Sequence, residues 1–361
     1  MKIARVDVVL YRIPAEKPRV DAIQSVEAVE MPVVEVTTDS GLTGVGFTYT
    51  IGKGGPAVAS FIQHDLAPLT LGEDPLNTER VWQKLWWGTH WVGRGGVSSL
   101  GISALDIALW DIKARHAGMS LHQLLGGARD RMPVYSTDGG WLQLSEAELV
   151  EQSMAFLEQG FVAVKMKLGK PDGAEDVRRV RSVRKAIGDD AKLMADVNMG
   201  WKSHQAIDMA RRLEEFNLGW LEEPCENDDV SGHARLARST SIPIALGESL
   251  YNRYVFKEYI EAGAVSIVQA DVGRVGGITE WMKVAHMAES FNLSVSPHFL
   301  MELHLPLVAS IPNGLYVEYV PYLERVIEEP LALKDGCYEA PKQVGLGFTF
   351  DNGKLKRYRV E

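Results

Sequence analysis

Charged side chains end a series of short apolar segments in the second half of the sequence. The residues at these ends are Lys167, Asp196, Glu222, Glu248, Asp271, His298 and Glu318. Neighbouring members are separated by 20 to 29 residues, about the length of one strand, one helix and two loops. Because an unpaired buried ion costs several kcal/mol, a run of them in step with a repeat indicates one shared site.

Three consecutive members of this series are carboxylates, namely Asp196, Glu222 and Glu248. One such acid commonly caps a helix or pairs with a lysine, but three in phase repel one another unless a cation lies among them. Oxygen ligands favour a hard divalent ion, and we expect Mg²⁺ because it accepts one-oxygen carboxylate ligation and keeps sites for water or substrate. Glu223 is expected to point to the other side of its strand.

Two lysines and a histidine–aspartate pair surround these acids in the repeat. Lys165 and Lys167 lie two residues apart, so on a strand both point to one face. Their ammonium groups are expected to lower each other's pKa, which suits an amine base. Asp271 is expected to hold the His298 imidazole in one tautomer and to raise its basicity. The site can then transfer protons on two opposite faces of one carbon.

Glu318 closes the last segment of the series. If it is held protonated, we expect it to donate a hydrogen bond to a substrate carboxylate.

The repeat predicts the elements that hold these side chains. Eight strand segments, from MPVYST at 132–137 to LYVEY at 315–319, alternate with helical patterns. This alternation predicts a closed parallel (β/α) barrel, whose chemistry lies at the carboxyl ends of its strands. An open doubly wound sheet is the alternative, but it would not gather the charged ends around one mouth.

The remaining parts of the chain predict a second, smaller unit. Residues 1–126 read as antiparallel strands followed by helices, and we expect an α+β capping domain. The barrel is expected over 127–324. A tail over 325–361 is expected to return to the capping domain and complete it.

Composition limits the partners. The 361 residues carry a formal net charge of −10, which argues against nucleic acid and anionic membranes as partners. Apolar runs fall short of the roughly 18 residues that a membrane helix needs. Only two cysteines, Cys225 and Cys337, occur. Their small number is typical of a reducing compartment, and the cytoplasm is the expected location.

The whole chain resembles the enolase superfamily, and within it the mandelate racemase group. The matching motifs are ISALDIALWDIKARHAG, VKMK, MADVN, WLEEP, GES, QAD, SPH and VEY, in the family's order and spacing. The resemblance implies Mg²⁺ on the three carboxylates and an enolate formed by α-proton abstraction. It also implies that Lys167 is the base towards one face, that Lys165 tunes it, and that the His298–Asp271 pair serves the other face. A homo-oligomer is expected from the resemblance alone.

The reaction expected from this resemblance is dehydration of an aldonate or aldarate to a 2-keto-3-deoxy acid, with His298 as the general acid. The SPHF and WVGRGG segments resemble the talarate/galactarate dehydratases, whereas GFTYTIGKGG resembles sugar-acid cycloisomerases. Racemisation or epimerisation of a 2-hydroxy acid and lactone cycloisomerisation use the same groups and remain alternatives. A catalytically silent binding barrel is least favoured, because the charged series is intact.

The substrate is expected to be a small hydroxylated carboxylate, because the loops near 17–26 and 46–58 are polar. Candidate residues for binding it are Lys17, Arg19, Tyr49, Lys53, Arg94 and Asn198.

Overall fold

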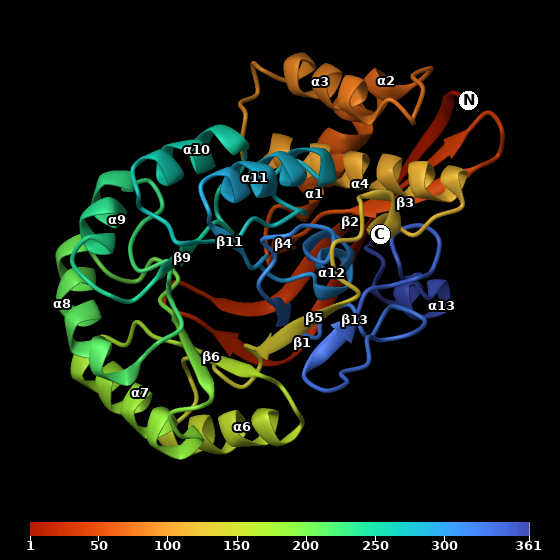
Figure 1. The fold of residues 1–361 in the computed structure, drawn as a ribbon. Coiled ribbons are helices and arrows are strands. Elements are labelled where there is room, and N and C mark those ends of the chain that lie inside the picture. The colour runs from red at the N-terminus through yellow and green to blue at the C-terminus, as the bar shows by residue number, and fades with distance from the viewer. Residues whose placement is uncertain (361) are drawn as a thin grey trace.

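A computed structural model describes residues 1–360, in which an antiparallel sheet with helices lies against the mouth of a parallel barrel (Figure 1). The N-terminal sheet runs in the order β1-β2-β3, and β4 also pairs with β2. Its strands are β1 (Ile3–Val20), β2 (Ser25–Thr38), β3 (Thr43–Phe47) and β4 (Thr50–Ile51). The helices that follow are α1 (Gly55–Phe61), the π-helical turn Ile62–Leu66, α2 (Ala67–Thr70), α3 (Thr78–Gly88), α4 (Val97–Ala117) and α5 (Leu121–Leu124).

Helix α4 packs on this sheet and also contacts α1, α3 and α11, which explains why its sequence is apolar on most sides. Most of its residues are buried, and the inward Val34 and Val36 of β2 belong to the same core. Gly46 of β3 permits the close approach, because a Cβ added there would lie 2.0 Å from the Ala104 carbonyl oxygen. The expected α+β cap therefore forms.

The barrel contains eight parallel strands in the order β11-β10-β9-β8-β7-β6-β5-β12. They are β5 (Arg131–Ser136), β6 (Ala163–Lys167), β7 (Lys192–Asp196), β8 (Leu221–Glu222), β9 (Ile244–Leu246), β10 (Ile267–Val268), β11 (Ser294–Val295) and β12 (Val317–Tyr319). The ring closes just before β12, where Val295 N donates to Asn313 O at 2.9 Å and Leu315 N donates to Val295 O at 2.8 Å. The predicted parallel (β/α) barrel is thus confirmed.

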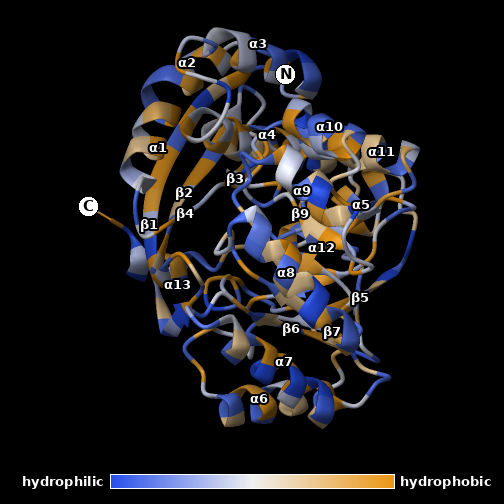
Figure 2. Cartoon of the chain, turned by 90° about the vertical axis from the view of Figure 1, so that its left-hand side faces the viewer, coloured by the Kyte–Doolittle hydropathy of each residue, from blue (hydrophilic) through white to orange (hydrophobic). Residues whose placement is uncertain are grey.

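Helices cover the outside of the barrel and connect its strands (Figure 1). They are α6 (Glu146–Glu158), α7 (Gly173–Ile187), α8 (Ser203–Leu213), α9 (Val230–Ala237), α10 (Arg253–Glu261), α11 (Ile278–Ser290) and α12 (Met301–Val308). Along α8, Ala206, Met209, Ala210 and Leu213 are buried, while Asp208, Arg211 and Arg212 are exposed. Figure 2 shows the resulting mixture of hydrophilic and hydrophobic segments on α7 and α8. Such helices bury one face on the strands and expose the other.

The tail after β12 contacts both parts of the molecule. Val360 N donates to Leu10 O at 2.9 Å, and the rings of Phe348 and Phe350 pack edge-on against Phe47 of β3. These contacts place the end of the tail on the cap, with α13 (Asn352–Leu355) among them. However, β13 (Cys337–Glu339) pairs antiparallel with β5 of the barrel, which the sequence did not predict. The domain bounds at 126 and 324 remain predictions.

The cap is attached to the barrel at the loop that follows β10 and at the start of α11. Thr48 Oγ1 donates to Gly273 O at 2.6 Å, and Trp82 Nε1 donates to Gly276 O at 2.7 Å. Asp106 of α4 accepts from Thr279 N at 2.8 Å. These contacts hold the β3–β4 turn at the carboxyl ends of the barrel strands. Within residues 1–360, none of the helices combines the length and apolarity that crossing a membrane requires.

Candidate active site

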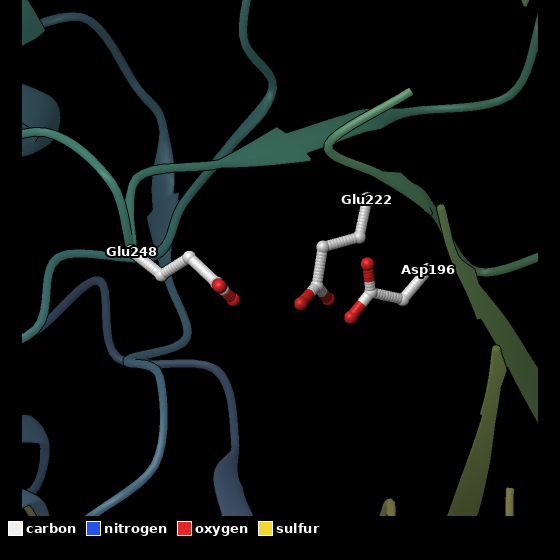
Figure 3. Close-up of side chains that lie close together, drawn as sticks. All are labelled: Asp196, Glu222 and Glu248. Carbon is white, nitrogen blue, oxygen red and sulfur yellow. The ribbon is translucent and has the colours of Figure 1, made fainter. Parts of the chain in front are cut away.

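Three carboxylates meet at the carboxyl ends of three neighbouring strands. Asp196 ends β7 and Glu222 ends β8, and the parallel register pairs these two positions. Glu248 follows β9 by two residues, and one oxygen of each acid lies within 4.8 Å of the others. Figure 3 shows all three side chains pointing into one space. Glu223, by contrast, accepts a hydrogen bond from Asn227 Nδ2 at 2.5 Å.

Neighbouring donors orient these carboxylates. Trp220 Nε1 and Gln269 Nε2 donate to Glu222 Oε2 at 2.8 and 2.7 Å. Asn198 N donates to Asp196 Oδ1 at 2.9 Å. Burial and the nearby Asp196 raise the pKa of Glu222 to about 8, so the clustered negative charge is costly without a cation. Oriented, hard oxygen ligands at this spacing fit Mg²⁺.

Both lysines at the end of β6 point into the same cluster. Lys165 Nζ lies 2.6 Å from Glu222 Oε1 and 2.8 Å from Glu318 Oε1, and Lys167 Nζ lies 2.5 Å from Asp196 Oδ2. The prediction that the lysines have lowered pKa values is wrong for this geometry. Burial lowers the pKa of each ammonium, but the facing carboxylates outweigh burial and raise both pKa values. Sequence reasoning counted the neighbouring ammonium and missed these acids.

The predicted His298–Asp271 pair lies across the cluster from Lys167. His298 Nδ1 is 2.8 Å from Asp271 Oδ2, and its Nε2 is 3.3 Å from Glu248 Oε2. Burial alone lowers the pKa of His298, but Glu248 and Asp271 outweigh it and raise that pKa to about 9. Burial would raise the pKa of Asp271, yet its hydrogen bond from His298 and the charge beside it leave that pKa below the ordinary value.

Glu318 of β12 is ionised in this arrangement, not protonated as the sequence analysis expected. Thr137 Oγ1 donates to its Oε1 at 2.6 Å and Phe299 N donates to its Oε2 at 2.7 Å. Burial would raise the pKa of Glu318, but the charge of Lys165 outweighs burial and holds that pKa below its usual range. Thr137 itself follows β5 at the same position of the repeat. It was missed because only charged residues were considered.

A cavity of about 70 Å³ opens beside the cluster. Lys167, His298 and Glu248 line it from the barrel, and Arg19 and Tyr49 line it from the cap. The site therefore places an ammonium group and an imidazole around one cavity next to three carboxylates.

Comparison with known proteins agrees with this arrangement. Residues 4–126 match the mandelate racemase / muconate lactonizing enzyme N-terminal domain, and residues 148–354 match the enolase C-terminal domain-like family. The chain belongs to the mandelate racemase/muconate lactonizing enzyme family of the enolase superfamily. The predicted family is thus confirmed.

Individual relatives resemble this family member over nearly their whole length. The 3,6-anhydro-α-L-galactonate cycloisomerase of Streptomyces coelicolor is 41% identical over 99% of this chain and 99% of its own. A racemase structure from S. coelicolor A3(2) with bound magnesium has a TM-score of 0.96, with 40% identity over 99% of this chain and 100% of that one. The L-talarate/galactarate dehydratase of Salmonella typhimurium LT2, liganded with Mg and L-lyxarohydroxamate, has a TM-score of 0.95, with 36% identity over 100% and 93%.

The candidate substrate residues of this family member fall into two groups. Arg19, Tyr49 and Asn198 line the cavity. Lys17, Lys53 and Arg94 are exposed and do not line it, so their expected position was wrong. The Arg94 guanidinium lies over the Trp86 ring instead, 5.4 Å from its centroid, and the Arg94 carbonyl accepts from Asn252 Nδ2 at 2.9 Å. Polar loop composition did not distinguish inward from outward side chains.

Arg19 is held in one orientation by residues that the sequence analysis missed. Its Nε and Nη2 donate to Asp138 Oδ1 at 3.1 and 2.7 Å. The rings of Trp141 and Tyr322 lie 5.7 and 5.2 Å from the guanidinium carbon. A guanidinium fixed in this way loses little side-chain freedom when it binds an oxygen-rich ligand.

Tyr49 is placed differently from the expectation. Its hydroxyl donates to Asp271 Oδ2 at 2.5 Å and lies 3.3 Å from His298 Nδ1, so it engages the histidine–aspartate pair instead of facing freely into the cavity.

Proposed function

We propose that this protein is a Mg²⁺-dependent acid-sugar dehydratase that converts an aldonate or aldarate into a 2-keto-3-deoxy acid and water. The observation that carries this proposal is the position of Lys167 and His298 around one cavity next to three convergent carboxylates. The likeness to the L-talarate/galactarate dehydratase supports the same chemistry.

Asp196, Glu222 and Glu248 would hold the metal ion. When bound, Mg²⁺ would polarise the substrate carboxylate and stabilise the negative charge that develops on it. Lys165 then lies beside Glu222 and Glu318. We assign Lys165 to the substrate carboxylate and to tuning Lys167, and Glu318 to holding Lys165 in place.

Lys167 removes the α-proton of the substrate as a free amine. The charge of Asp196 raises the pKa of Lys167 here. Asp196 is also one of the three carboxylates that would hold Mg²⁺, and the charge of that ion would offset the effect of Asp196 and favour the free amine. His298 donates the proton from its Nε2 to the β-hydroxyl, which leaves as water. The resulting enol becomes the 2-keto acid when C3 takes up a proton and the C2 hydroxyl loses one. Arg19 and Asn198 are assigned to the hydroxyl groups or the distal carboxylate.

A cycloisomerase is the second candidate. It is favoured by the 41% identity to the S. coelicolor anhydro-galactonate enzyme over 99% of the chain. The same two groups would serve there, with an internal ring oxygen in place of the departing hydroxyl. Racemisation of a 2-hydroxy acid needs only proton transfer on both faces and uses the same pair.

One panel experiment separates these functions. The protein with Mg²⁺ is incubated in D₂O with aldonates, aldarates, their lactones and anhydro-sugar acids, and products are followed by proton NMR. A 2-keto-3-deoxy acid formed from an open-chain acid with loss of water supports the dehydratase. Reaction of only the lactones or anhydro acids identifies a cycloisomerase, and exchange at C2 without either product identifies a racemase or epimerase. A panel that shows neither product nor exchange refutes the proposal.

We also propose a cytoplasmic homo-oligomer. Both cysteines are free thiols, which supports a reducing compartment. Trp87, Trp91 and Val92 near the end of α3 are 59%, 91% and 63% exposed, and such apolar clusters are typical of protein interfaces. Sedimentation of the wild type and of Trp91→Ser tests the proposed oligomer, because a monomeric wild type refutes it.

A further inference from the structure

The turn between β3 and β4 brings two adjacent cap residues to the loop that follows β10. Thr48 Oγ1 donates to the Gly273 carbonyl oxygen at 2.6 Å, and the Tyr49 hydroxyl donates to Asp271 Oδ2 at 2.5 Å. Both side chains are buried, with Thr48 fully enclosed and Tyr49 only 3% exposed. The turn therefore makes one contact with the loop backbone and one with the histidine–aspartate pair.

Both oxygens of the Asp271 carboxylate accept hydrogen bonds. Oδ1 accepts from Gly273 N at 2.7 Å, and Oδ2 accepts from Tyr49 and from His298 Nδ1 at 2.8 Å. Because a carboxylate oxygen only accepts, the His298 proton on this side is on Nδ1. Nε2 is then the nitrogen that faces the cavity.

We infer that Tyr49 is a positioning residue for proton transfer on the His298 face: its hydroxyl fixes Asp271, and Asp271 fixes the imidazole. This inference rests on the proposed function, which assigns that face to His298. The opposite face differs, because Lys167 takes its ion-pair partner Asp196 from the barrel itself. The cap thus positions His298, whereas a barrel residue positions Lys167.

The substitution Tyr49→Phe isolates the hydroxyl. The ring stays edge-on to Phe299, with centroids 5.0 Å apart, so the packing of the turn is kept. A hydrogen bond to a charged group contributes enough that its loss is expected to slow transfer on the His298 face by roughly ten- to hundredfold. Transfer on the Lys167 face is expected to stay unchanged.

The assay measures exchange of the C2 proton in D₂O, at saturating substrate with Mg²⁺, for a reactive acid and its C2 epimer. Lys167→Ala and His298→Asn identify which epimer presents its proton to which group. Thr48→Val is the matched control, because it removes the neighbouring hydrogen bond of the same turn without touching Asp271. Melting temperatures of the Tyr49 and Thr48 variants show that both are folded.

Tyr49→Phe is expected to slow C2 proton exchange only for the epimer whose exchange His298→Asn abolishes. Equal slowing of both epimers, slowing of neither, or the same pattern in Thr48→Val overturns the inference. A wild-type enzyme that exchanges no proton and forms no product refutes the proposed function first, and the inference with it. The two failures are therefore distinguished before any variant is compared.

Discussion

Removal of one carboxylate of the triad should greatly reduce the stabilisation of the folded protein by Mg²⁺. Glu248 is the member to replace, because its side chain is 14% exposed while Asp196 is fully buried, so Glu248→Gln disturbs the core least. At a Mg²⁺ concentration 100-fold above its Kd, binding stabilises the folded protein by about 2.7 kcal/mol. With an unfolding entropy of ~2.1 cal/mol/K per residue, the 361 residues correspond to about 0.76 kcal/mol/K. The expected rise in melting temperature is therefore about 3–4 °C.

Glu248→Gln should reduce this shift to about 0.5 °C if loss of the charged ligand weakens binding roughly 100-fold, because the remaining stabilisation is then about 0.4 kcal/mol. Thermal unfolding with increasing MgCl₂, with NaCl added to constant ionic strength, measures the shift. Glu215→Gln, an exposed acid on the barrel surface, serves as the control and should keep the full shift. A full shift in Glu248→Gln, or no shift in the wild type, would refute the assignment of the metal site.

Four further changes have defined outcomes. Lys165→Met leaves two buried carboxylates without their shared cation and should lower the unfolding free energy in EDTA by about 3–5 kcal/mol in urea titrations; an unchanged value would contradict the buried ion pairs. Arg19→Met should raise KM with little change in kcat, and a fall in kcat alone would argue against a binding role. Burial raises the pKa of the Asp106 carboxyl from 3.8 to about 7. Between pH 3.8 and pH 7 the folded protein therefore holds a proton on Asp106 that the unfolded chain has lost, and the free energy of unfolding falls as the pH rises. Asp106→Asn should therefore reduce the amount by which the melting temperature at pH 5 exceeds that at pH 8. An unchanged difference would exclude Asp106 as the cause of this pH dependence. Gly46→Ala should cost about 1–3 kcal/mol by separating β3 from α4, and a neutral effect would contradict that close contact.

The barrel and the triad were predictable because both depend on spacing along the chain. In a parallel barrel the ends of all strands meet at one mouth, so a repeat of strand and helix lengths is enough to bring Asp196, Glu222 and Glu248 together. The protonation states were not predictable in the same way. They depend on which charges face each other across the barrel, and Lys165 meets Glu318 from a strand 153 residues later in the sequence.

The contacts of the cap residues could not be predicted from the sequence. Tyr49 and Asp271 are 222 residues apart, and no periodic pattern links a turn of one domain to a loop of another. Arg19 and Arg94 are both arginines in polar stretches of the sequence, yet only Arg19, near the end of β1, has an acid, Asp138, placed to aim it into the cavity. Side-chain direction in an irregular segment is decided by such partners.

The packing of the tail on the cap determines when the cap can be finished during synthesis. Phe47 of β3 is translated early, but its aromatic partners Phe348 and Phe350 emerge from the ribosome some 300 residues later. Domains usually fold in the order in which they are made, whereas here every strand of the barrel is made before the first domain is complete. The emerging chain thus holds all three metal ligands while its cap still lacks part of its core.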